Sequence, residues 1–346
     1  MAKYLGLVLD ERFLTYETAP FSPENPERIA HLYEQLKGGG WYHLIEPRMA
    51  STEELALVHG QAYIEEVRGL SVKGGRLAPD TWIAPGGFEI SALAAGGVIK
   101  AVEETVKGKL NMAFALVRPP GHHASRDKGM GFCVFNSVAI GAKYALEALG
   151  VKKVLVVDWD VHHGNGTQEI FYADPRVLYF SIHQYPFFPD SGYFDEVGEG
   201  EGKGYTVNVP LPIGCTDVDY SNIFRRLLLP LASEFEPELV IVSAGFDPHQ
   251  LDPLGGMNLS EKGFGRLTQL VLKVAEELCN SKVVFVLEGG HHPYALSRSV
   301  FEVLRLCCEK DLALQLDFEQ REDENYYKIK PFIQTVKECL QNKWKI

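Results

Sequence analysis

The chain has 346 residues, of which 46% are hydrophobic, and a formal net charge of −12 at pH 7. Its length and apolar content suffice for a large buried core. The acidic balance argues against direct nucleic-acid binding, because phosphate neutralisation requires a stripe of lysine and arginine; it suits a cationic substrate.

Membrane insertion and a disulfide scaffold are not expected. No apolar stretch reaches the roughly 18 residues that cross a bilayer, and Met1 to Asp10 lacks the pattern of a secretory leader. The six cysteines form no CxxC pair, so cysteine-ligated zinc is not expected either. We therefore expect a cytoplasmic protein.

Short β-branched and apolar runs recur along the chain, several of them nearly continuous in apolar residues, as buried parallel strands are. They are Tyr4–Leu9, Met112–Val117, Val154–Val157, Val177–Ile182, Tyr205–Val209, Leu239–Val242 and Val283–Leu287.

Segments with helical periodicity lie between and after these runs. The alternation predicts an α/β fold with helices on both faces of a mainly parallel sheet. No repeat or linker divides the chain, so we expect one catalytic domain over residues 1–310 with a helical extension, residues 311–346, packed on it. The predicted helices are Phe88–Val106, Ser137–Leu149, Asp217–Phe235, Glu261–Cys279, Tyr294–Cys308 and Tyr326–Asn342.

Metal-type side chains follow two of the predicted strands. After Val154–Val157, the two-residue period of an extended chain puts Asp158, Asp160 and His162 on one side. Leu239–Val242 leads into Asp247. Asp160, His162 and Asp247 would make a three-ligand site with a position left for water. A single aspartate at such a place more often caps a helix or anchors a loop, but several on two strand ends favour a metal.

Two further strands end in loops of similar character. Met112–Val117 leads into His122 and His123, which in a turn can converge on one water molecule. Val283–Leu287 leads into Glu288, two glycines and His291, and the glycines let the backbone approach a ligand.

In these residues the sequence resembles the zinc-dependent histone deacetylase superfamily, which includes acetylpolyamine amidohydrolases and acetoin-utilisation proteins. The resemblance covers nearly the whole chain to about residue 310. It rests on motifs in the family's order: Arg118–Ala124 (RPPGHHA), Gly131-Phe132-Cys133 with Asn136, Asp158–Thr167 (DWDVHHGNGT), Phe188–Gly192 (FPDSG), Ala244–Asp247 (AGFD) and Glu288–His291 (EGGH).

The resemblance implies metal-assisted amide hydrolysis, with zinc bound by Asp160, His162 and Asp247. It implies that His122, hydrogen-bonded to Asp158, and His123 flank the water. The partner of His123 is Asn165, as in the class II branch, and an amide holds an imidazolium less strongly than a carboxylate does. His123 is therefore the expected general base. The hard Asp–His–Asp donor set could also accept Fe²⁺.

The resemblance also implies a narrow tunnel and two structural cation sites, often filled by potassium. The tunnel walls would be Phe132 and Phe188, beside Gly131. The first potassium site would use Asp158, Asp160, His162, Ser181 and Ile182, and the second Phe171, Asp174, Val177 and Tyr205.

The sequence departs from the family at His291, where most active deacetylases have a tyrosine whose hydroxyl binds the oxyanion. Class IIa histone deacetylases share this histidine and are weak on acetyl groups. Losing one such donor typically costs about 10²–10³ in rate, so we expect slow turnover of acetyl-lysine. Tyr294 is a second candidate donor, although packing explains it better. Ser22 replaces the histidine of the family's HPExPxR segment, with an altered rim or oligomer contact as the only expected consequence.

Other functions stay open at this stage. A manganese ureohydrolase has a similar fold but needs more carboxylates to bridge two metals, and here Pro248 and His249 follow Asp247. A non-catalytic binder of acylated lysine would not need the full set of metal and histidine residues. Acylated lysine and acylated polyamine are both expected substrates. The loop Pro186–Gly204 and the segment Asp80–Trp82 would form the rim that selects between them, and a homo-oligomer is conceivable.

Overall fold

The structure is a computed structural model that describes residues 5–308 and 313–346, without the side chains of residues 313–322 and 324. An eight-stranded sheet runs through its centre, and every neighbouring pair of strands in it is parallel. In spatial order the strands are β2 (His43–Ile45), β1 (Leu5–Val8), β5 (Met112–Ala115), β10 (Val283–Leu287), β9 (Leu239–Ala244), β6 (Val154–Asp158), β7 (Val177–Gln184) and β8 (Thr206–Leu211).

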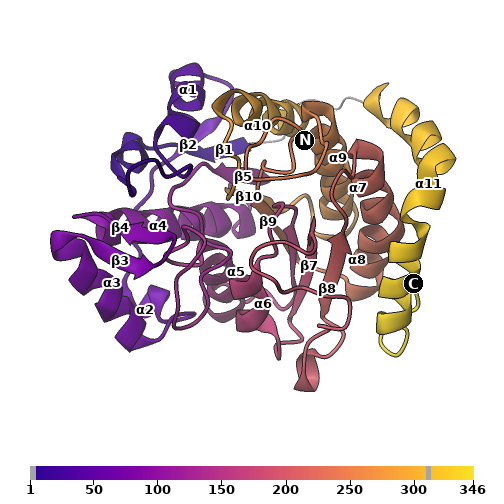
Figure 1. Ribbon diagram of the computed structural model, residues 1–346, viewed down its shortest axis with the longest axis horizontal. Coiled ribbons are helices and arrows are strands. Elements are labelled where there is room, and N and C mark those ends of the chain that lie inside the picture. The colour runs from indigo at the N-terminus through magenta and orange to yellow at the C-terminus, as the bar shows by residue number, and fades with distance from the viewer. Residues whose placement is uncertain (1–4, 309–312) are drawn as a thin grey trace.

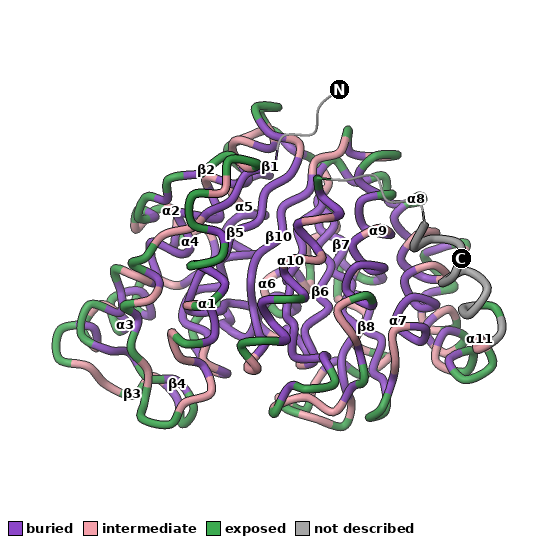
Figure 2. The backbone as a smooth tube through the Cα atoms, turned by 90° about the horizontal axis from the view of Figure 1, so that it is seen from above, coloured by how far each residue is buried: buried purple, intermediate pink, exposed green. Residues whose placement is uncertain are grey.

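The central strands are buried along their whole length, which explains why their sequences are almost continuously apolar. Strand β6 pairs with β9 and β7 in register, so that Asp158 lies between Ser243 and Ser181. The carboxyl ends of these strands therefore meet at one edge of the sheet. Figure 2 shows the sheet as the buried centre of the molecule, with exposed segments confined to its periphery.

Helices cover both faces of this sheet (Figure 1). Helices α4 and α5 pack on each other and on the central strands, while α1, α10, α9 and α7 form a row of neighbouring helices outside the opposite face. The helices are α1 (Glu27–Leu36), α2 (Thr52–Leu55), α3 (Gln61–Lys73), α4 (Gly87–Val106), α5 (Ser137–Ala148), α6 (Asn165–Phe171), α7 (Asp217–Ile223), α8 (Leu229–Phe235), α9 (Glu261–Leu278), α10 (Pro293–Cys308) and α11 (Ala313–Leu340).

The structure confirms the predicted three-layer α/β architecture and its mainly parallel sheet. Each of the seven predicted strands is present, apart from Tyr4, which lies outside the described residues. The predicted helix Asp217–Phe235 is interrupted by a π-helical turn, Phe224–Leu228, between α7 and α8. Pro230 lies in the first turn of α8 and has no amide hydrogen to donate, which favours such a local break.

The first 90 residues contain elements that the sequence analysis did not predict. Helix α1 buries Ile29, Leu32, Tyr33 and Leu36, whose spacing is that of one helical face and was a usable signal. Strand β2 and the antiparallel hairpin of β3 (Gly75–Ala78) and β4 (Thr81–Ile83) are three or four residues long, too short for a periodic pattern to show.

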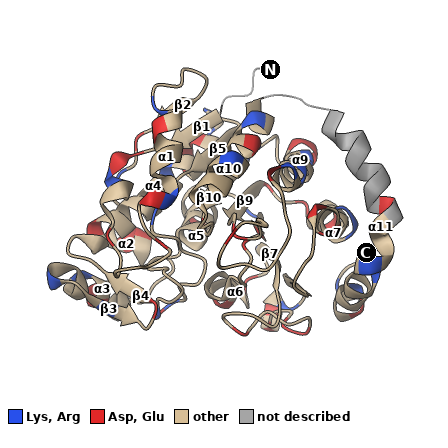
Figure 3. Cartoon of the chain, turned by 45° about the horizontal axis from the view of Figure 1, so that its top comes forward, with Lys and Arg blue, Asp and Glu red and all other residues tan. Residues whose placement is uncertain are grey.

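The C-terminal helix α11 packs against α7 and contacts strand β8. Beyond it, the indole Nε1 of Trp344 donates a hydrogen bond to the carbonyl of Gly204 at 2.6 Å. The predicted boundary between residues 310 and 311 lies outside the described residues, and the division there stays a prediction. Among the described residues, no helix is long and apolar enough to cross a membrane. Figure 3 shows that acidic and basic residues lie mainly on helices and loops.

Candidate active site

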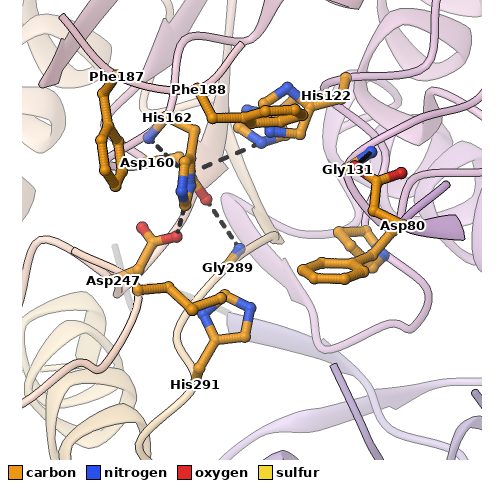
Figure 4. A pocket seen from close by; sticks show the side chains of 14 residues that line it. Asp80, His122, Gly131, Asp160, His162, Phe187, Phe188, Asp247, Gly289 and His291 are labelled. Carbon is orange, nitrogen blue, oxygen red and sulfur yellow. Dashed lines mark hydrogen bonds and ion pairs between the residues drawn. The ribbon is translucent and has the colours of Figure 1, made fainter. Parts of the chain in front are cut away.

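The loops that follow β5, β6, β9 and β10 enclose a cavity of about 260 Å³ at the carboxyl edge of the sheet. Figure 4 shows that imidazole and carboxylate side chains surround it, together with the rings of Phe187 and Phe188. Its lining residues are Asp80, Pro120, His122, His123, Gly131, Phe132, Asp160, His162, Phe187, Phe188, Asp247, Leu254, Gly289 and His291.

Three of these residues form a group with the geometry of a metal site. Ligand atoms of Asp160, His162 and Asp247 all lie within 4.8 Å of one another. The Nδ1 atom of His162 lies 3.0 Å from Asp160 Oδ1 and 3.1 Å from Asp247 Oδ2. The other carboxylate oxygens are already bonded, because Gly289 N donates to Asp160 Oδ2 and Val161 N donates to Asp247 Oδ1. His162 Nδ1, Asp160 Oδ1 and Asp247 Oδ2 therefore face each other, and Asp160 Oδ1 also accepts from His162 N at 2.9 Å.

The electrostatics of this group fit a bound divalent cation. Asp160 and Asp247 are both fully buried, and burial together with the charge of Asp160 raises the pKa of Asp247 to about 6. Two buried carboxylates this close are costly without a compensating positive charge. One nitrogen and two oxygens also match a zinc site that keeps a position for water.

The two adjacent histidines converge on the same end of the cavity, with ring centroids 4.0 Å apart. His122 Nδ1 lies 3.1 Å from Asp158 Oδ2, and His123 Nδ1 lies 2.8 Å from Asn165 Oδ1. Both bonds were predicted. Because an amide oxygen and a carboxylate can only accept, both imidazoles carry their proton on Nδ1. Each therefore presents Nε2 away from its partner.

The two histidines differ in charge. Burial opposes protonation of His122, but the carboxylates of Asp160 and Asp158 outweigh it and raise the pKa of His122 well above its usual value. Burial, assisted by repulsion from His122 and His162, lowers the pKa of His123 well below its usual value. The surroundings thus favour the protonated form of His122 and the neutral form of His123.

Aromatic rings narrow the cavity above these groups. Phe188 meets His123 edge to face at 5.2 Å, and Phe132 lies across the cavity near His291. Phe187, which was not predicted to line the cavity, stacks on His162 with centroids 5.2 Å apart. Gly131 has a positive φ, and a Cβ there would lie 2.3 Å from the ring of His123, so only glycine fits beside the histidine.

His291 lines the cavity as predicted, with a side chain that is only 3% exposed. Its backbone N–H donates to Asp252 Oδ2 at 2.5 Å, and its Nδ1 lies 3.5 Å from Asp252 Oδ1. Asp252 also accepts from the N–H of Leu254, another lining residue. Tyr294 is 53% exposed and its hydroxyl bonds to Arg298, so it does not reach the cavity.

A buried ion network supports the loop that carries His291. Arg28 donates to the carbonyls of Glu288 and Gly290 and to Glu24, and Arg118 donates to Glu24 with two nitrogens. The motif around Arg28 and Glu24 was recognised in the sequence, but this role was not. Ser22 itself borders a shallow recess beside the mouth, together with Asp80 and Phe132.

The residues of the predicted potassium sites lie at two places. Those of the first site lie at the carboxyl ends of the neighbouring strands β6 and β7, where Asp158 pairs with Ser181. For the second site, the carbonyl of Phe171 accepts from Asp174 N, that of Asp174 accepts from Val177 N, and that of Tyr205 accepts from Tyr179 N. The carboxylate of Asp174 is paired with Lys143 and Arg176.

The fold coincides with that of known proteins. The family described as the histone deacetylase domain matches residues 22–307, so the chain belongs to this family and is a hydrolase of the deacetylase class. A probable deacetylase from Archaeoglobus fulgidus is 38% identical over 98% of both chains. This membership also favours a deacetylase over a ureohydrolase.

Eukaryotic relatives are longer than this chain. The human polyamine deacetylase HDAC10 is 43% identical over 80% of this chain, but the match spans only 43% of the human protein. Histone deacetylase 5 of Arabidopsis thaliana is 38% identical over 98% of this chain and is matched over 54% of its length. The crystal structure of the HDA15 HD domain, 36% identical, superposes with a TM-score of 0.84 and covers 98% of this chain and 100% of that chain.

Proposed function

We propose that the protein is a zinc-dependent deacylase of linear amides formed by lysine side chains or polyamines, and that it is slow on plain acetyl groups. The observation that carries this proposal is the convergence of a three-donor metal group and two differently charged histidines at the closed end of an aromatic-walled cavity. Such a cavity suits an aliphatic stem that leads to an amide.

Asp160, His162 and Asp247 would hold the metal. When bound, zinc would polarise the amide carbonyl and lower the pKa of water. The same donor set could hold Fe²⁺, since two of its three ligands are hard carboxylates. Potassium at the two places described above would be structural.

The two histidines would have different roles in the reaction. Neutral His123 would take a proton from the attacking water as general base, because its free Nε2 can accept one. His122, kept cationic by Asp158 and Asp160, would stabilise negative charge that develops on the carbonyl oxygen. A histidine then returns a proton to the leaving amine, and the products are a carboxylic acid and a free amine.

His291 is the basis for the expected acyl preference. It occupies the cavity wall where most family members have the tyrosine that donates to the oxyanion. Its imidazole is shorter than a phenol, and its backbone N–H donates a hydrogen bond to Asp252. We expect acyl groups that are intrinsically more reactive, such as trifluoroacetyl, to be hydrolysed faster than acetyl, because they depend less on the missing donor.

The amine of the substrate can belong to either of two classes, lysine side chains or polyamines. Names of relatives point to both, since one is called a polyamine deacetylase and others histone deacetylases. In both classes an aliphatic stem leads to the amide, as the aromatic walls require. Asp80, an exposed carboxylate at the mouth, suits a cationic substrate of either kind.

The test is a panel of fluorogenic lysine amides carrying acetyl, trifluoroacetyl and longer acyl groups, assayed with the zinc-loaded wild type, His291→Tyr and Asp247→Ala. We expect wild type to be slow on acetyl and His291→Tyr to raise that rate by about 10²–10³. A parallel panel of acetylated polyamines identifies the amine class. If wild type and His291→Tyr leave every amide intact while wild type still binds acyl-lysine, the protein is a binder and the proposal is wrong.

A further inference from the structure

A second cluster of polar side chains, four of them buried and two half-buried, lies behind the aromatic wall and has no part in the reaction above. It consists of His163, Gln168, His183, Ser191, Glu196 and Asn208, called the His163 cluster below. His163 and His183 are almost completely buried, with ring centroids 4.7 Å apart. The cluster joins the loop of the metal ligand His162 to the loop of Phe187 and Phe188.

Glu196 determines which atoms donate and which accept in the hydrogen bonds that link Gln168 and His163. The carboxylate of Glu196 can only accept, so Gln168 must turn its amide nitrogen toward it, at 2.6 Å. The amide oxygen of Gln168 then faces His163 Nε2 at 3.0 Å and accepts from Asn208 Nδ2 at 2.7 Å. His163 must therefore carry its proton on Nε2.

These donor and acceptor roles fix the contact between His163 and the loop that carries Phe187 and Phe188, called the wall loop below. With its proton on Nε2, neutral His163 presents a lone pair at Nδ1 and accepts from the hydroxyl of Ser191 at 2.7 Å. Glu196 completes the anchor, since its other oxygen accepts from the N–H groups of Gly192 and Tyr193, each at 2.8 Å. The carboxylate of Glu196 thus determines the donor and acceptor roles in the network and also holds the backbone of the wall loop in place.

His183 also binds the wall loop. Its Nε2 donates to the carbonyl of Gly192 at 2.9 Å, and its Nδ1 accepts from the hydroxyl of Ser181. Gly192 has a φ of +84°, and a Cβ there would lie 2.6 Å from both imidazoles. The loop therefore rests directly on the two rings, and a side chain at this position would lift it.

We propose that the His163 cluster positions the aromatic wall. The donor and acceptor roles within the cluster then set the width of the passage formed by Phe187 and Phe188. These two rings contact His162 and His123, so a shift of the loop changes the passage at the point where the amide is held. His163, Ser191 and Glu196 act here as positioning residues. The kinetic part of this inference rests on the proposed function.

The sharpest test is Glu196→Gln, which keeps the shape but places an amide nitrogen opposite that of Gln168. Because two donors then face each other, Gln168 turns over and its oxygen no longer faces His163. We expect kcat/KM for acyl-lysine amides to fall by about 10-fold, mainly through KM, as for other partners one step removed from a metal site. Zinc content should stay that of wild type.

Ser191 provides a matched set of variants. Ser191→Ala should raise KM, and Ser191→Thr, which keeps the hydroxyl, should restore it. Tyr193→Phe removes a hydroxyl from the same loop on a side chain that is 46% exposed, and should leave KM unchanged. Equal KM values for wild type, Glu196→Gln and Ser191→Ala would refute the positioning role.

A readout that needs no turnover separates this inference from the proposed function. Imidazole ¹⁵N spectra of the zinc-loaded protein should show His163 and His183 each protonated on Nε2, and Glu196→Gln should change the His163 pattern alone. If wild type hydrolyses no amide but shows these tautomers and this change, the proposed function fails and the network stands. A wild-type His163 protonated on Nδ1 would overturn the network itself.

Discussion

Two sides of the cavity are built in different ways. Asp160, His162 and Asp247 follow strands β6 and β9 at the buried centre of the sheet, and backbone N–H groups bind their remaining oxygens. His291 instead stands in a loop that is held by Asp252 from another loop and by Arg28 from helix α1. The sheet therefore positions the proposed metal ligands, whereas contacts between loops position His291 opposite them. Changes in acyl preference need not disturb the fold.

The largest effect should come from the side built on strand ends. Asp247→Asn removes one metal donor, so we expect turnover to fall to background and zinc to be lost on dialysis. Thermal unfolding gives an independent measure, because free zinc at 1,000 times its Kd should stabilise wild type by about 4 kcal/mol and the variant far less. Asp127→Asn makes the same change of charge at an exposed position and should behave as wild type.

The next largest effect should come from His123, the proposed general base. His123→Gln should lower kcat by about 10²–10⁴, the usual contribution of a positioned base, while zinc content stays unchanged. The measurement is single-turnover hydrolysis of a trifluoroacetyl-lysine amide. A decrease below tenfold would show that another group takes the proton.

On the other side, Arg28→Met should destabilise the protein by about 3 kcal/mol, the lower part of the range for breaking a buried pair, because Glu24 keeps Arg118 as a partner. Denaturant unfolding of the zinc-loaded protein measures this change. Arg126→Met is the control, since Arg126 and its neighbour Asp127 are both exposed. Equal unfolding free energies for the two variants would contradict the supporting role of the network.

The smallest effect is expected at Tyr294, whose hydroxyl bonds to Arg298 on the exposed side of α10. Tyr294→Phe should change the rate on acetyl-lysine by less than twofold and stability by less than about 0.5 kcal/mol, as for other surface substitutions. A large loss of rate on acetyl but not on trifluoroacetyl substrate would mean that this hydroxyl does reach the oxyanion.

The side of the cavity built on strand ends was predictable from the sequence because regular strands place residues at fixed intervals. Asp158, Asp160 and His162 share one side of an extended chain, and parallel strands bring their ends to one edge, so Asp247 had to lie near them. The position of His291 could be predicted for the same reason.

The supporting groups could not be predicted, because their partners are distant in the sequence and no period connects them. Arg28 and Glu288 are 260 residues apart, and Asp252 lies in an irregular loop. Phe187 precedes the motif residue Phe188 in a loop whose course depends on the buried His163 cluster. Only the family resemblance placed Phe132 and Phe188 at the cavity.

The strand order has a consequence for how the chain acquires its structure during synthesis. Strand β10, near the end of the described chain, inserts between β5 and β9, so the sheet stays split until residues 283–287 have left the ribosome. Until then the apolar edges of β5 and β9 face solvent, and non-local pairing of this kind is slow. We therefore expect released fragments that end before Val283 to require chaperones to remain soluble.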